Sequence, residues 1–218
     1  MLRWLTRTLS SSVGRKIVLG FTGLLLVGFL LEHLHGNLKL YEDADGEAFN
    51  GYVEFLHGFG PLLTVAELGL GALFLCHIVI ALRLALENRE ARKHGYAHRG
   101  NRGAQTPGSV SMHVTGALIL AYLIKHLIDF RFAGGFFEDP AARVKETLSH
   151  PATALVYLAA ALVVGLHLSH GFQSAFQSIG ISHPKLRRPL EVLGYGLVAL
   201  FTIGFASFPV RYLLFGGE

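Results

Sequence analysis

The chain has 218 residues, of which 51% are hydrophobic and only 16% are charged, and its mean hydropathy is +0.45. A soluble domain usually carries about 25% charged residues, so this composition excludes an ordinary soluble globular protein. The net charge of +4 does not indicate nucleic-acid binding, because the basic residues lie mostly in short connections between long apolar blocks. The pattern predicts a multi-pass membrane protein.

The N-terminal segment resembles a signal peptide, because Arg3, Arg7, Arg15 and Lys16 precede an apolar run. The run continues from Ile17 to Leu31, however, and no small-x-small cleavage site follows it. We therefore interpret it as the first membrane span.

Hydropathy predicts a single all-α domain over residues 1–218, with spans at about 15–36, 60–86, 110–131, 151–177 and 190–213. Each matches or exceeds the roughly 20 residues that cross a hydrocarbon core. The runs lack the alternation of a barrel strand, so they are expected to be helices. Pro61, Pro151 and Pro189 stand near the starts of three spans, where a first-turn proline loses no hydrogen bond.

The distribution of Lys and Arg predicts the orientation of the bundle. Thirteen of these residues lie in the N-terminal segment and in the second and fourth connections, with five on the other side. The N-terminus is therefore expected in the cytoplasm and the C-terminus outside. The second connection, at 87–109, is basic and rich in glycine, which suits an acidic partner or lipid headgroups.

Four of the predicted spans carry a histidine in their interior, where ionisable side chains usually mark function. At about 1.5 Å per residue, His77 and His167 each lie roughly 15 Å from the inner edge. His33 and His126 lie roughly 26 and 22 Å from it. The sequence therefore predicts two levels, with His77 and His167 nearer the cytoplasm.

Two imidazoles from different helices at one depth suit the two faces of a porphyrin. Two axial histidines would fill both open iron positions, so electron transfer is the expected chemistry. The single cysteine, Cys76, excludes an internal disulfide, an iron–sulfur cluster and C-x-x-C-H haem attachment, so any haem is non-covalent. We expect Cys76 to fill space on a helix. Hydrogen-bonding histidines, a proton or metal transporter and a haemless structural anchor are the alternatives that the spacing leaves open.

The order of several short motifs resembles the five-helix dihaem cytochrome b subunit of succinate:quinone oxidoreductases, which include succinate dehydrogenases and fumarate reductases. The first span ends in a motif similar to the H-L-x-x-N of that family. The resemblance rests on His33-Leu34-His35-Gly36-Asn37, Gly46-Glu47-Ala48-Phe49-Asn50, His77, Val114-Thr115-Gly116 with His126, Ser149-His150-Pro151 and His167-Leu168-Ser169-His170-Gly171.

The resemblance implies that His33 and His126 ligate a distal haem b, and that His77 and His167 ligate a proximal one. It thereby favours His33 over His35, which lies about 200° away around the helix. His170 is a candidate for a haem propionate contact. Family members that move protons across the membrane carry a glutamate two residues before the fourth-span ligand.

In this chain the position two residues before His167 is Gly165, which argues against the proton route of those family members. The resemblance also implies partners: an iron–sulfur subunit and a flavoprotein subunit on the cytoplasmic side of a bacterial inner membrane. The chain would carry electrons between succinate, oxidised in the tricarboxylic acid cycle, and a membrane quinone, expected to be menaquinone.

The resemblance is compatible with succinate oxidation and with fumarate reduction, and it is compatible with single complexes and with dimers of complexes. A cytochrome b subunit of another respiratory complex, such as a hydrogenase or formate dehydrogenase, is the nearest alternative.

Carboxylates in the outer half of the bundle are candidates for proton exchange with the quinone. Glu67 lies early in the second span, while Glu32, Lys125 and Asp129 lie near the distal ligands. Because intramembrane carboxylates are rarely idle, we hypothesise that Glu67 helps to form a quinone site. A carboxylate hydrogen-bonded within the bundle is the other interpretation.

Overall fold

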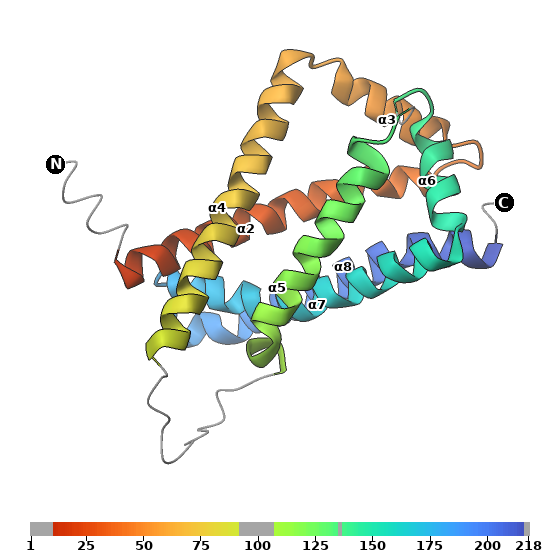
Figure 1. The fold of residues 1–218 in the computed structure, drawn as a ribbon. Helices are drawn as coiled ribbons and strands as arrows, with labels where there is room; N and C mark the ends of the chain where they lie inside the picture. The colour runs from red at the N-terminus through yellow and green to blue at the C-terminus, as the bar shows by residue number, and fades with distance from the viewer. Residues whose placement is uncertain (1–10, 92–106, 135–136, 216–218) are drawn as a thin grey trace.

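The computed structural model describes residues 11–91, 107–134 and 137–215, and these residues form helices and turns without a strand. Figure 1 shows the arrangement of the helices. In chain order they are α2 (Ser12–Leu38), η1 (Lys39–Tyr41), α3 (Glu47–His57), α4 (Pro61–Ala91), α5 (Pro107–His126), η2 (Leu127–Arg131), α6 (Pro140–Ser149), α7 (Pro151–Ser178) and α8 (Pro184–Phe215).

Five of the described helices are long and apolar enough to cross a membrane, as the hydropathy predicted. Large apolar side chains cover their outer surfaces; on α4, for example, Leu68 is 70% exposed and Leu75 is 65% exposed. Such a surface is unfavourable in water and suits lipid. The predicted all-helical class and the five spans are confirmed.

The fifth helix begins earlier than predicted, at Pro184, so Pro189 lies inside α8 rather than in its first turn. The Lys185 backbone N–H donates to Nδ1 of His183 at 3.2 Å and satisfies one free donor of the helix end. The first turns of α8 are polar, which is why hydropathy placed the start of the span too late.

Helix α7 is the centre of the bundle and packs against α8, α5 and α2, whereas α4 packs mainly on α2 (Figure 1). The α7–α8 contact is close because Gly165 has no side chain. A Cβ atom there would lie 2.1 Å from Oγ1 of Thr202. Phe201, the neighbour of Thr202 on α8, is completely buried.

Two short helices, α3 and α6, lie together at one end of the bundle (Figure 1) and were not predicted. Gly46 has a φ of +80° and lies so close to α6 that a Cβ atom would be 2.3 Å from that of Ala141. Asn50 accepts a bond from the Ala141 N–H at 2.8 Å and donates to Asp139 at 3.0 Å. Asp139 caps α6 and is followed by Pro140, a helix-start signal present in the sequence.

The start of α2 and the end of α8 lie at opposite ends of the bundle (Figure 1). Part of the charge asymmetry falls outside the described residues: Arg3 and Arg7 precede them, and residues 92–106 hold most of the second connection.

Candidate functional site

The first predicted histidine pair comes together between α2 and α5. The rings of His33 and His126 have centroids 5.7 Å apart and meet edge to face at 87°. Both residues are half-buried. We call them the aromatic pair, because aromatic side chains surround them.

Phe29, one turn before His33, stacks on its ring at 5.3 Å and an interplanar angle of 21°. Nδ1 of His126 is buried without a protein hydrogen-bond partner. Such a nitrogen is costly unless a group from outside the chain binds the ring. The other neighbouring rings are Phe205 beside His33, and Tyr122, Phe130 and Tyr157 beside His126.

His35, the other histidine of the first-span motif, lies on a different face of α2. Its side chain is 64% exposed and lies 3.8 Å from Glu32. Its ring centroid lies 6.4 Å from that of Tyr52 of α3. Helical geometry thus separates the two motif histidines, and His33 is the one that meets His126.

The second predicted pair comprises His77 of α4 and His167 of α7, and a threonine of a neighbouring helix lies beside each of them. Oγ1 of Thr22 lies 3.1 Å from Nδ1 of His77. Oγ1 of Thr115 lies 3.0 Å from Nδ1 of His167. We call these histidines the threonine-bonded pair. His170 is half-buried, one turn beyond His167, and its propionate role stays a prediction.

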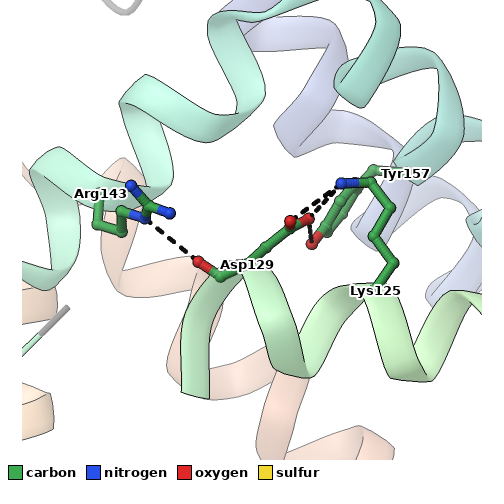
Figure 2. Close-up of polar contacts among 4 residues, drawn as sticks. All are labelled: Lys125, Asp129, Arg143 and Tyr157. Carbon is green, nitrogen blue, oxygen red and sulfur yellow. Dashed lines mark hydrogen bonds and ion pairs between the residues drawn. The ribbon is translucent and has the colours of Figure 1, made fainter. Parts of the chain in front are cut away.

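A polar cluster lies beside the aromatic pair, centred on Asp129 (Figure 2). Its carboxylate accepts bonds from Nζ of Lys125 at 2.8 Å and from the hydroxyl of Tyr157 at 2.7 Å. Nε of Arg143, from α6, donates to the backbone oxygen of Asp129 at 3.2 Å. The Asp129 side chain is only 15% exposed, so its largely enclosed charge is stabilised by these partners.

The segment that carries Asp129 is a π-helical turn that directly follows His126. The Phe132 N–H bonds to the oxygen of Leu127, five residues back, at 2.8 Å. Such wide turns recur at functional sites. Asp129 and Lys125 could be singled out from the sequence, but Tyr157 and this turn could not, because an intramembrane tyrosine and a change of helical pitch leave no periodic signal.

Glu67, the predicted quinone-site residue, forms an ion pair with Arg131 of η2 at 3.0 Å. The two side chains are 39% and 46% exposed, respectively. The contact joins α4 to the end of the α5 segment. Glu67 is thus a paired carboxylate at the margin of the bundle, and its partner could not be predicted from the sequence.

The haem that the resemblance implies would need a particular set of donor atoms from the protein. Among the described residues, no group of three or more His, Cys, Asp or Glu side chains could hold a metal ion. A porphyrin iron needs only two axial protein ligands, which is the number that each pair offers. The bonded Nδ1 atoms leave Nε2 of His77 and His167 available, and the unpartnered Nδ1 of His126 marks a ring without a protein partner. The residues fit.

Comparisons of this chain with protein-family models, with curated proteins and with solved structures gave no match. The resemblance therefore rests on the motifs themselves, and the structure gives several of them a local role. Nδ2 of Asn37 donates to the backbone oxygen of His33 at 2.7 Å. Gly36 lies against Tyr52, whose ring a Cβ atom would approach to 2.5 Å.

Proposed function

We propose that the chain is the dihaem cytochrome b membrane anchor of a succinate:quinone oxidoreductase. The observation that carries the proposal is the placement of four interior histidines from four different spans: His33 and His126 are in ring contact, and His77 and His167 each lie beside a threonine hydroxyl of a neighbouring helix. Ionisable side chains inside membrane spans are costly and by default mark functional sites, so four such histidines indicate a function within the bundle.

In this proposal His33 and His126 hold one haem b, and His77 and His167 hold the other. Bis-histidine haem b supplies one-electron transfer and leaves no iron position open for oxygen. The chain's own residues hold the imidazoles. Thr22 and Thr115 bond one pair, while Phe29 and its aromatic neighbours pack around the other.

The proposed orientation places Ser12 near the cytoplasm, following the positive-inside rule. The threonine-bonded pair is then the proximal one, facing an iron–sulfur subunit and a flavoprotein subunit in a bacterial inner membrane. The chain itself does not react with succinate. It passes electrons between those subunits and a membrane quinone, with menaquinone as the expected type.

The aromatic pair lies at the outer end in this orientation, next to polar groups suited to a quinone. Glu67 is the proposed site residue, and its ion pair with Arg131 holds the carboxylate in place. The Asp129 cluster supplies a second polar region at the same end. A quinone that takes up two electrons also takes up two protons, so acidic groups near the outer haem have a use.

The test is a reduced-minus-oxidised spectrum of the purified chain, combined with haem quantification as the pyridine haemochrome. We expect two low-spin haems b per chain, and copurification of a succinate-oxidising flavoprotein from native membranes. A different flavoprotein or a hydrogenase would indicate another respiratory complex. A colourless chain, after expression with sufficient haem, would end the proposal and favour a histidine-based transporter.

A further inference from the structure

Two threonines stand out among the described residues, because their side chains are polar and yet almost completely buried. Thr22 of α2 is 5% exposed and Thr115 of α5 is 3% exposed. Each lies within hydrogen-bond distance of a histidine on another helix. Each is also followed by a glycine, and Thr-Gly occurs at only these two places in the sequence.

The direction of the two inter-helix bonds follows from the hydroxyl's own contacts. Oγ1 of Thr22 lies 2.9 Å from the oxygen of Val18, and Oγ1 of Thr115 lies 3.0 Å from that of Ser111. A carbonyl oxygen only accepts, so each hydroxyl gives its single proton to its own helix. The threonine oxygen must then accept a bond from the histidine ring.

This direction places a proton on Nδ1 of both imidazoles. A ring that donates through Nδ1–H and is neutral carries its free lone pair on Nε2. His77 and His167 therefore share one tautomer, and Nε2 is the nitrogen that can bind a metal.

The glycines complete the arrangement by letting each ring approach the neighbouring helix. A Cβ atom on Gly23 would lie 3.4 Å from Cε1 of His77. A Cβ atom on Gly116 would lie 3.6 Å from Cε1 of His167. Each ring thus rests against a threonine hydroxyl and a glycine backbone on one helix.

We propose that Thr22 and Thr115 are positioning residues that hold His77 and His167 in the Nδ1–H tautomer and direct Nε2 to a haem iron. The assignment rests on the proposed function. An acceptor on Nδ1–H orients the ring and increases its basicity as a ligand. Because a more basic ligand favours ferric iron, losing the hydroxyl should weaken haem retention and raise the reduction potential.

The experiment compares Thr22→Val and Thr115→Val with Thr22→Ser and Thr115→Ser in the purified haem-loaded chain. The readouts are haem content, a redox titration and the EPR spectrum of the ferric state. We expect each valine variant to retain the haem of the threonine-bonded pair less tightly, by about tenfold, and to shift the reduction potential of that haem upward. The serine variants keep the hydroxyl and should behave like the original chain.

Thr202→Val is the matched control, because the buried Thr202 hydroxyl has no hydrogen-bond partner and contacts Gly165 rather than a histidine. It should leave both haems unchanged. A valine variant that keeps the haem of the aromatic pair unaltered has folded. Its loss of the haem of the threonine-bonded pair is then a local effect. Valine variants with unchanged haem retention, potentials and EPR spectra would overturn the assignment while leaving the cytochrome proposal intact. An original chain without haem would overturn both.

Discussion

The two histidine pairs are held in different ways. The threonine-bonded pair is fixed by hydrogen bonds of 3.1 and 3.0 Å to side chains on neighbouring helices. In the aromatic pair, Nδ1 of His126 is buried without a partner, and rings such as Phe29 surround the imidazoles. A hydrogen bond selects one ring nitrogen, whereas packing restricts only where the ring lies. Histidine rings in one bundle are therefore oriented by hydrogen bonds in one pair and by aromatic packing in the other.

The largest expected effect on haem content comes from single variants that each remove one histidine, either from the threonine-bonded pair or from the aromatic pair. Under the proposed function, we expect His167→Ala to lose one haem and keep the other, and His126→Ala to do the reverse, because the pairs use different residues. Pyridine haemochrome quantification and separate redox titrations measure this. His35→Ala is the control, since that side chain is 64% exposed and does not meet His126. Loss of both haems from either single variant, with helicity retained, would show that the two pairs are not independent.

Tyr157→Phe tests whether the polar cluster supports the aromatic pair alone. The hydroxyl bonds to the largely enclosed Asp129 carboxylate at 2.7 Å, and losing a bond to a charged group costs about 2 kcal/mol. We expect a lower melting temperature in detergent and a spectral change confined to the haem of the aromatic pair. Tyr195→Phe, at a residue that is 62% exposed, should change neither. An equal spectral change at both haems would contradict the distinction between the pairs.

Phe29→Leu tests the role of stacking at His33. The rings lie 5.3 Å apart, and such aromatic contacts contribute about 1 kcal/mol beyond simple burial. We expect a modest loss of thermal stability and a broadened EPR signal from the haem of the aromatic pair. Phe21→Leu on the same helix is the control, because Phe21 is 58% exposed. An EPR signal as narrow as that of the original chain would show that stacking does not hold the ring.

Glu67→Gln should have the smallest effect on stability. Its ion pair with Arg131 is largely exposed, and such pairs contribute about 1 kcal/mol or less. We nevertheless expect slower quinone turnover by the assembled complex, with unchanged haem spectra. Glu42→Gln removes another exposed ion pair, with Lys39, and should leave turnover unaffected. Unchanged turnover in the Glu67 variant would end its assignment to a quinone site.

The sequence by itself determined the five spans and placed His33, His77, His126 and His167 within them. Hydropathy and helical rise are local properties, so length and spacing were enough. The same reasoning placed the start of α8 too late, because its first turns are polar, and it overlooked α3 and α6, which are too short to register as spans.

Only the tertiary structure decided what each histidine contacts. The bond from His77 to Thr22 joins residues 55 positions apart, and that from His167 to Thr115 joins residues 52 apart. The ion pair of Glu67 with Arg131 spans 64 positions. Such contacts depend on how helices cross and rotate against one another, because side chains must interdigitate to pack. A hydropathy pattern records which residues avoid water, but not which of them meet.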